Sequence, residues 1–404
     1  MKRAEDAIIY DSINPAVFDA ATLERLSRTR VAFITDIPTP YVVALLRALT
    51  RHIDLSVVFS AENSTRGMPW RFSTDFGFRY SVVGGATIRR ADAEGIDYYF
   101  DPRLLAHLYR IRPDVIISAG FSFPTFYSKI YAQITGAKLL IYSDGTSVAE
   151  QNYGRLRRFA RDYLVPRASG VIAKSKLAAE RFTEMGAAGK IVVAHHTTDL
   201  APFLAVGKER LDTVEEPAPL RLINVGRMIA RKGLDCLLEA LRRLPPTQRA
   251  VQLTLVGSGP HEAQLRAIAQ TMSRATVTFA GFVDQLGLPA FYRSADAFVL
   301  PTFLDPFGIV MLEAAASGLA LLGSVYAGAT HELVMNQISG IRFDPHQPDD
   351  LAAAIAILAD NPSLVRRMGQ AAHRIALHRT PERSAEGYLV AIMRALSQHK
   401  ILTD

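Results

Sequence analysis

The 404-residue sequence is short of several residue types and patterns. Its single cysteine, Cys236, excludes a disulfide framework and indicates a reducing compartment. The longest uncharged stretch, residues 314–330, has 17 residues, whereas a helix that spans a membrane needs roughly 20. Three glycines also interrupt this stretch. The first 28 residues contain many charged side chains and lack the apolar core of a signal peptide. We therefore expect a cytoplasmic protein with neither a leader nor a transmembrane segment.

Acidic residues are also in deficit. The chain has 46 Lys and Arg against 39 Asp and Glu, which gives a net charge of +7 and a pI near 9.5. Such a balance predicts an anionic partner, whether nucleic acid, a phosphate-bearing metabolite or a membrane surface. The 49% hydrophobic residues indicate a globular chain with large cores, and the length suggests two or three domains.

Short β-branched runs alternate with helical patterns along the chain. The first set of expected strands is RVAFIT, DLSVVFS, DVIISAG, KLLIYSD, SGVIAKS and KIVVAHH. After a polar stretch at residues 206–220, the alternation restarts with RLINVG, VQLTLVG, TVTFAG, DAFVLPT and LALLGS. Strands that alternate with helices predict parallel sheets covered on both faces. The sequence therefore predicts an α/β protein with two doubly wound domains, residues 1–205 and 206–379.

Ligands of such sheets bind beyond the carboxyl ends of the strands, so residues that follow strands are candidates. Arg227 and Lys232 lie five positions apart in the loop after RLINVG, just before a helical pattern. Two cations beside a helix N-terminus are suited to a diphosphate. The alternative is a basic loop that is merely solvated.

Two carboxylates follow the expected strand DAFVLPT. Asp305 and Glu313 are eight positions apart in DPFGIVMLE, and a continuous helix would place them about 12 Å apart along its axis. That is roughly the span from the sugar to the ribose of a nucleotide sugar, with the diphosphate over the amides at Gly308, and carboxylates accept hydrogen bonds from hydroxyl pairs. Alternatively, Asp305 followed by Pro306 is a helix N-cap and nothing more.

These segments resemble the carboxyl-terminal domain of the family 4 glycosyltransferases. The resemblance rests on GRMIARKGLDCLLEAL, LVGSGP, GFVDQLGLPAFYRSADAFVLPTFLDPFGIVMLEAAASG and YAGATHELV, and it runs almost continuously over residues 221–343. It implies the GT-B fold, in which two Rossmann-like domains face each other across a cleft that holds the donor. It also implies that the last helix, within residues 380–404, packs back on the first domain.

The resemblance assigns roles to individual residues. It implies that Arg227 and Lys232 hold the donor diphosphate, that Asp305 contacts the transferred sugar, and that Glu313 binds the ribose hydroxyls. Further donor contacts are expected at Val283 and at the helix start, Gly308, Ile309 and Val310. Such enzymes retain the anomeric configuration by a front-face reaction, in which the leaving diphosphate assists deprotonation of the acceptor.

The sequence departs from the family pattern in two places. The first acid is Asp305 rather than Glu, which leaves the identity of the sugar open. In the first domain the glycine pair after the first strand is absent, and Ser143, Asp144 and Gly145 stand where a His is common. Asp144 is therefore a candidate contact for the acceptor hydroxyl or the donor sugar, and equally a candidate cap of the next helix.

No metal or other cofactor is expected. Asp92 to Glu94 follows no apolar strand, and the neighbouring pair His195 and His196 cannot both face one ion from a strand, because adjacent side chains alternate. The resemblance implies a reaction that needs only positioned charge.

The acceptor is less clearly indicated. Residues 153–164 form a basic amphipathic helical pattern with Leu156, Phe159, Ala160, Tyr163 and Leu164 on one face and the arginines largely off it. Such a helix rests on an anionic membrane or binds a lipid diphosphate, or else its apolar face is simply core. The aromatic segment 67–85 is a candidate acceptor loop or a packed hairpin.

The resulting prediction is a retaining transferase that moves a hexose from a UDP- or GDP-linked sugar to a glycan or a lipid-linked acceptor in envelope or exopolysaccharide synthesis. The alternatives are a GT-B nucleotide-sugar epimerase, a transferase that makes small glycosides, and a non-catalytic subunit that binds nucleotide sugar. Nucleic-acid binding would account for the pI but not for the acid pair.

Overall fold

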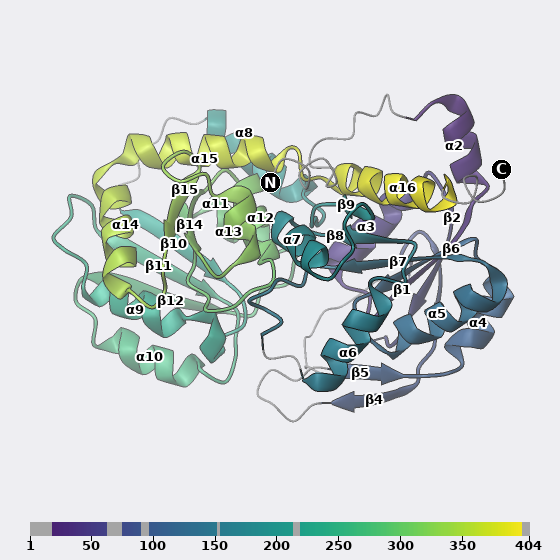
Figure 1. Ribbon diagram of the computed structural model, residues 1–404. Coiled ribbons are helices and arrows are strands. Elements are labelled where there is room, and N and C mark those ends of the chain that lie inside the picture. The colour runs from purple at the N-terminus through teal and green to yellow at the C-terminus, as the bar shows by residue number, and fades with distance from the viewer. Residues whose placement is uncertain (1–17, 63–74, 90–96, 152–153, 213–218, 398–404) are drawn as a thin grey trace. The chain divides into compact units, whose positions relative to one another are not determined.

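The computed structural model describes residues 18–62, 75–89, 97–151, 154–212 and 219–397 (Figure 1). The chain divides into two compact units. The first contains the described residues up to Thr198 together with those from Pro381 onward, and the second is Asp199–Thr380. The division therefore falls a few residues before the expected boundary at residue 206, because α8 (Ala201–Asp212) packs on α11 and α12 of the second unit.

The first unit is built on a seven-stranded parallel sheet with the order β3-β2-β1-β6-β7-β8-β9. Its strands are β1 (Arg30–Thr35), β2 (Asp54–Phe59), β3 (Arg79–Val82), β6 (Val115–Ala119), β7 (Lys138–Ser143), β8 (Gly170–Ala173) and β9 (Ile191–Val193). Its helices are α2 (Ala20–Ser27), α3 (Pro40–Leu49), α4 (Leu104–Ile111), α5 (Phe123–Thr135), α6 (Arg155–Leu164), α7 (Lys176–Glu184) and α16 (Pro381–Ser397). A separate antiparallel pair consists of β4 (Ala86–Arg89) and β5 (Asp97–Phe100).

The second unit has a six-stranded parallel sheet with the order β12-β11-β10-β13-β14-β15. Its strands are β10 (Leu220–Val225), β11 (Val251–Val256), β12 (Ala275–Gly281), β13 (Ala297–Leu300), β14 (Ala320–Ser324) and β15 (Gly340–Phe343). Besides α8, its helices are α9 (Leu234–Arg242), α10 (Glu262–Gln270), α11 (Leu288–Arg293), α12 (Ile309–Ala316), α13 (Gly328–Leu333), α14 (Pro348–Asp360) and α15 (Pro362–Ala376).

Central strands of both sheets are buried along their length, as in β8 and β13, because helices cover both faces. This explains why they read as continuous apolar runs rather than as alternating ones. The predicted fold class, two doubly wound α/β domains, is confirmed. The sequence did not indicate β3 or β15, which are both edge strands of four residues.

The described part of the aromatic segment, residues 75–85, is neither a hairpin nor an open loop. It contains β3, which pairs in parallel with β2, and Phe76 is buried against the rings of Phe59 and Tyr80. Residues 67–74 lie outside the described ranges. The described aromatic side chains Phe76 and Tyr80 therefore pack at the edge of the hydrophobic core, beside Phe59.

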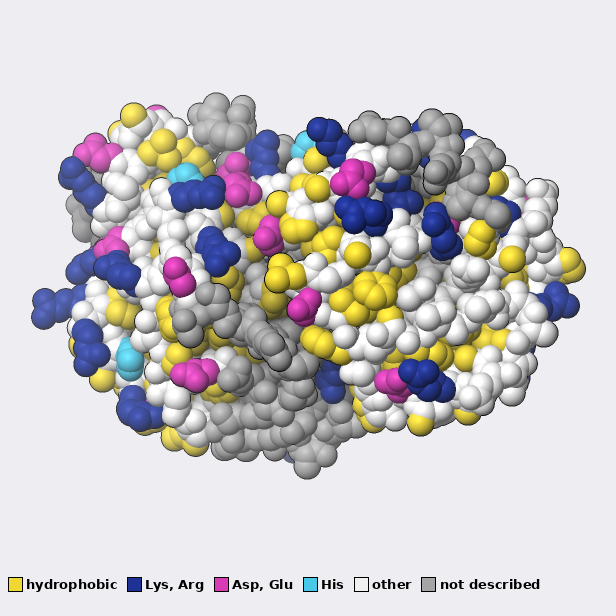
Figure 2. All heavy atoms as spheres, turned by 180° about the vertical axis from the view of Figure 1, so that it is seen from behind, with side chains coloured by type: hydrophobic (Ala, Val, Ile, Leu, Met, Phe, Trp, Pro, Cys, Tyr) yellow, Lys and Arg dark blue, Asp and Glu magenta, His cyan; other side chains and the backbone are white. Residues whose placement is uncertain are grey.

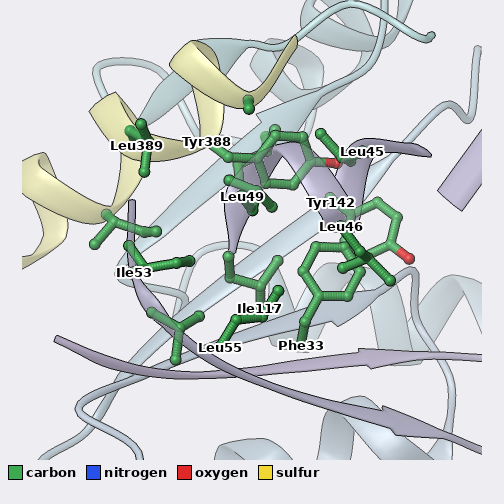
Figure 3. Packing of buried hydrophobic residues seen from close by; sticks show 14 of the residues in the cluster. Phe33, Leu45, Leu46, Leu49, Ile53, Leu55, Ile117, Tyr142, Tyr388 and Leu389 are labelled. Carbon is green, nitrogen blue, oxygen red and sulfur yellow. The ribbon is translucent and has the colours of Figure 1, made fainter. Parts of the chain in front are cut away.

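Helix α16 completes the core of the first unit (Figure 3). It packs on α3, and its fully buried Tyr388 lies with its ring centroid 5.9 Å from that of Phe33 and 6.2 Å from that of Tyr142. Leu389 enters the same cluster. The last helix is therefore an integral part of a core whose other members precede it by more than 180 residues.

Basic side chains are scattered over the face shown in Figure 2 instead of forming one strip. Among the described residues, no helix is at once long and apolar enough to cross a membrane.

The Tyr388 side chain offers a test of this core. Its hydroxyl is buried and has no hydrogen-bond partner in the part of the chain that the structure describes. Tyr388→Phe should therefore leave the free energy of unfolding unchanged or raise it by about 1 kcal/mol, since a buried polar group without a partner is destabilising. Tyr388→Ala should lower it by about 3 to 5 kcal/mol, as for other large-to-small changes. Urea denaturation of the two variants measures both; a Phe variant as unstable as the Ala variant would show that the hydroxyl has a partner.

Candidate functional site

The loops at the carboxyl edge of the second sheet touch one another through their backbones. Gly257, after β11, has a φ of 130°, and a Cβ added there would lie 1.9 Å from the carbonyl oxygen of Gly226 after β10. The amide of Met228 donates to the carbonyl of Ser258 at 2.9 Å. Only glycine permits this approach, so the sequence pattern LVGSGP sets the position of the loop that carries Arg227.

The structure brings Lys232 and Asp305 together across 73 positions of sequence. Lys232 ends a short 3₁₀ turn (Ala230–Lys232) immediately before α9, and its Nζ lies 2.6 Å from Oδ2 of Asp305. The two side chains are only 18% and 13% exposed. Arg227 is partly buried in the same loop, which begins directly after β10. A residue expected at the diphosphate and one expected at the sugar are thus in direct contact.

Asp305 is not a helix cap. Helix α12 begins at Ile309, and its N-cap is Gly308, which has a φ of 94°. The Oδ1 atom of Asp305 accepts from the amide of Phe307 at 3.3 Å, and its backbone forms a parallel bridge with Ala327. The cap hypothesis is therefore wrong, and the continuous helix assumed for the 12 Å estimate is absent, because α12 begins only at Ile309.

The first turn of α12 presents backbone donors. Gly308, Ile309 and Val310 begin this helix, and the first amides of a helix have no acceptor within the helix. The side chains of Ile309 and Val310 pack on the core behind this turn, as does Val283 in the loop after β12. The amides and the positive end of the helix are suited to an anion.

Glu313 lies one turn further along α12 and is buried. Its Oε2 accepts from the hydroxyl of Tyr292 at 3.1 Å, and burial raises the pKa of the Glu313 carboxyl to about 7, which this hydrogen bond partly opposes. Tyr292 in turn packs edge-on against Phe203 of α8, with ring centroids 5.5 Å apart. The hydrogen bond therefore holds the carboxyl in one orientation, and burial favours its protonated form.

In the first unit, Asp144 follows β7 at the carboxyl edge. The next helix, α6, has Gly154 as its N-cap, so Asp144 does not cap it. The carboxylate lies 3.8 Å from Nε2 of the buried His196, whose pKa burial and the neighbouring Lys174 lower well below its usual value. Burial also lowers the pKa of Lys174 to about 8, and Asp144 counteracts part of that shift.

Lys174 and His196 were not recognised as site residues from the sequence. The available signal was position, because Lys174 directly follows β8 and His196 lies three residues beyond β9, at the same edge as Asp144. Both segments had been predicted as strands, so the rule that led to Arg227 also applied to them.

The loop that carries Asp144 is held by a buried ion-pair network. Oε2 of Glu150 lies 2.9 Å from Nη1 of Arg161 on α6 and 2.9 Å from Nε of Arg181 on α7. A Cβ added at Gly145 would lie 2.6 Å from Oε1 of Glu150, so the loop is packed closely over this carboxylate. The expectation that Arg161 lies off the buried face of its helix is therefore wrong.

Within the described ranges, no group of three potential metal-ligating side chains is present. Asp92 to Glu94 lie outside these ranges.

Comparisons with known proteins identify the family of the chain. A family model described as glycosyl transferases group 1 matches residues 208–375, and one described as glycosyltransferase family 4 matches residues 39–201. Glycogen synthase of Mycobacterium tuberculosis is 34% identical over 303 residues, which cover 72% of this chain and 69% of that protein. The chain belongs to the group 1 glycosyltransferases. The family resemblance seen in the sequence is confirmed, and this glycosyltransferase is an enzyme.

Two further relatives of the glycosyltransferase are informative. A lipopolysaccharide core biosynthesis glycosyltransferase of Rhizobium meliloti is 32% identical over 197 residues, covering 48% of this chain and 55% of that protein. The crystal structure of Anabaena HepE in complex with UDP-glucose superposes with a TM-score of 0.68 at 18% identity, covering 91% of this chain and 99% of that chain. The latter similarity shows the GT-B fold.

The raised pKa of Glu313 predicts how the stability of the glycosyltransferase depends on pH. The folded state keeps the proton up to about pH 7, whereas the unfolded chain releases it near the ordinary value of 4.5. The free energy of unfolding should therefore fall as the pH rises from about 4.5 to about 7 and then level off. Glu313→Gln should remove up to about 3 kcal/mol of this dependence.

Chemical denaturation of the wild type and the variant across this pH range measures the effect. Glu180→Gln, which changes an exposed carboxylate on α7, is the control and should follow the wild type. Identical pH profiles for wild type and Glu313→Gln would contradict the assignment.

Proposed function

We propose that this glycosyltransferase moves a hexose from a UDP- or GDP-linked sugar to a glycan or a lipid-linked acceptor, with retention of anomeric configuration, in the synthesis of envelope or extracellular polysaccharide. The observation that carries the proposal is the Lys232–Asp305 pair beside the amides that begin α12. Cation, amide donors and carboxylate meet at one sheet edge, as a charged diphosphate joined to a polyhydroxylated sugar requires. The UDP-glucose complex of HepE and the lipopolysaccharide role of the Rhizobium relative support this choice.

In this scheme the diphosphate lies against Arg227, Lys232 and the amides of Gly308, Ile309 and Val310. Lys232 then serves two anions, the phosphate and the carboxylate of Asp305, which fixes the carboxylate beside the sugar. Glu313 accepts hydrogen bonds from the ribose hydroxyls, and Val283 contacts the nucleoside. Because two hydroxyl donors stabilise a carboxylate, nucleotide binding should favour the ionised form of Glu313.

The reaction breaks the bond between the anomeric carbon and the diphosphate oxygen. A new bond forms from an acceptor hydroxyl oxygen to the same face of that carbon, and the hydroxyl proton passes to the departing diphosphate. Positive charge on Arg227 and Lys232 stabilises the leaving group, while Asp305 orients the sugar as positive charge develops on it. Asp144, held beside His196 and Lys174, contacts the acceptor hydroxyl or the sugar. The scheme requires no metal.

A panel of nucleotide sugars screened by thermal unfolding tests the donor assignment, because a ligand that binds the native state raises the melting temperature according to the ratio of its concentration to its dissociation constant. Stabilisation by UDP- or GDP-linked hexoses is expected. No shift with any nucleotide sugar would contradict the proposal.

The diphosphate contacts give a first mutational prediction. Arg227→Ala and Lys232→Ala should each weaken binding of nucleoside diphosphate by about 1.5 to 3 kcal/mol, the usual contribution of a hydrogen bond to a charged group. Titration calorimetry measures this, with Lys208→Ala on α8 as an exposed control. Unchanged affinity in either site variant would show that its cation does not contact the diphosphate.

Substitution of Glu313 and substitution of Asp305 should have different effects on nucleotide binding and on turnover. Glu313→Gln removes a contact made equally in the ground and transition states, so it should weaken donor and free-nucleotide binding with little further loss of turnover. Asp305→Asn should leave nucleoside diphosphate affinity unchanged or slightly tighter, since Lys232 loses its competing carboxylate. Its turnover should fall about 100-fold, because the oriented charge acts on the transition state. Steady-state kinetics with calorimetry separates the two, and wild-type turnover in Asp305→Asn would remove that residue from the reaction.

A further inference from the structure

Two helices of the first unit expose large apolar side chains to solvent. On α6, Leu156 is 75% exposed and Phe159 is 63% exposed, while on α5, Ile134 and Ile130 are 67% and 44% exposed. The core contacts of α6 are made instead by Ala160 and Leu164. The sequence had placed all these α6 residues on one face, but the structure separates them into a buried stripe and an outward one.

Two half-buried aromatic rings, those of Phe126 and Tyr163, connect the exposed apolar residues of the two helices. The ring of Tyr163 stacks with that of Phe159 at 6.2 Å on α6 and with that of Phe126 at 6.0 Å on α5. We call the region formed by Phe126, Ile130, Ile134, Leu156, Phe159 and Tyr163 the α5–α6 surface; Figure 1 locates the two helices.

The charge of these helices is almost entirely positive. Five cations lie on α5 and α6, namely Lys129, Arg155, Arg157, Arg158 and Arg161, against one acid, Asp162. The acid is paired with Arg161 at 2.9 Å. Arg155 and Arg158 are exposed beside Leu156 and Phe159. Just beyond α6, the guanidinium of Arg167 lies 4.4 Å from the centroid of the Tyr163 ring. The α5–α6 surface therefore combines exposed apolar groups with the exposed guanidinium groups of Arg155 and Arg158.

This combination distinguishes between partners. Nucleic acid would engage the arginines but leave four large aliphatic and aromatic side chains in water. A lipid interface takes both, because the apolar side chains enter the acyl boundary while the arginines extend to the headgroup phosphates. Anionic lipid adds an attraction of about 1 kcal/mol for each Arg or Lys near the surface.

We infer that the α5–α6 surface binds an anionic lipid bilayer, with Leu156 and Phe159 inserted at the interface. Binding to lipid is argued from the surface alone, whereas its use, delivery of a lipid-linked acceptor, rests on the proposed function. The ion pair between Arg161 and Glu150 connects α6 to the loop that carries Asp144. A bilayer bound to α6 would therefore be connected, through this ion pair and the loop of residues 144–150, to Asp144, which is proposed to contact the acceptor.

Cosedimentation with vesicles tests the inference. The full-length protein should pellet with vesicles of phosphatidylcholine and phosphatidylglycerol, much less with phosphatidylcholine alone, and less in high salt. The double variant Leu156→Ser with Phe159→Ser should lower the partition coefficient at least ~10-fold through lost apolar burial. Arg155→Gln with Arg158→Gln should lower it by roughly 10-fold or more on anionic vesicles only.

The matched control is Leu286→Ser, which removes a leucine that is 88% exposed in the second unit and should bind vesicles as the wild type does. All these side chains are exposed, so thermal unfolding and nucleotide binding should stay unchanged in every variant. Wild-type protein that fails to pellet with anionic vesicles, or serine variants that pellet like the wild type, would overturn the inference. So would self-association that the serine variants abolish in the absence of any vesicle binding, since a second copy would then cover the surface.

The proposed function is judged separately. Vesicle binding without transfer from any nucleotide sugar would leave the lipid surface intact and refute the transferase scheme. Transfer to a soluble acceptor without vesicle binding would support the transferase scheme and refute the lipid surface.

Discussion

The geometry of parallel sheets is the constraint on which the rest of this protein depends. All strands of each sheet end at the same edge, so residues far apart in sequence meet there without any local signal. In the second unit the loops approach so closely that backbone touches backbone, and the φ and the surroundings of Gly257 admit no side chain. Lys232 and Asp305 become neighbours because the loops that carry them are forced together at this edge.

Charge in the site is held in compensated states. In the second unit Asp305 is paired with Lys232, and burial raises the pKa of Glu313 to about 7. An isolated buried charge strongly destabilises the folded state. Pairing or protonation avoids most of this penalty while no ligand is bound. A ligand that brings phosphate and hydroxyl groups would share Lys232 with Asp305 and favour the ionised form of Glu313. Binding of the donor and rearrangement of charge are therefore expected to be coupled.

The two units use the same architecture for different chemistry. The edge of the second sheet offers cations, helix amides and two acids, a set suited to an anionic donor. The edge of the first offers Asp144 with two buried bases, on a loop tied through Glu150 to a surface helix. Core packing supports this division, because α16 brings Tyr388 and Leu389 into the first core from the far end of the chain. The core of the first unit is thus completed by residues that follow the second unit in sequence.

Much of this could be predicted from the sequence alone. Strand alternation was sufficient for two doubly wound domains, and the spacing of Arg227, Lys232, Asp305 and Glu313 indicated one edge of one sheet, because strands and the residues after them are local properties. The sequence could not decide that Asp305 pairs with Lys232 instead of capping α12, that His196 and Lys174 flank Asp144, or that Arg161 is buried while Phe159 is exposed. Each of these depends on contacts between side chains that are tens or hundreds of positions apart in the sequence. A helical pattern specifies which residues share a face, but only the packed neighbours determine which face meets the core and which meets solvent.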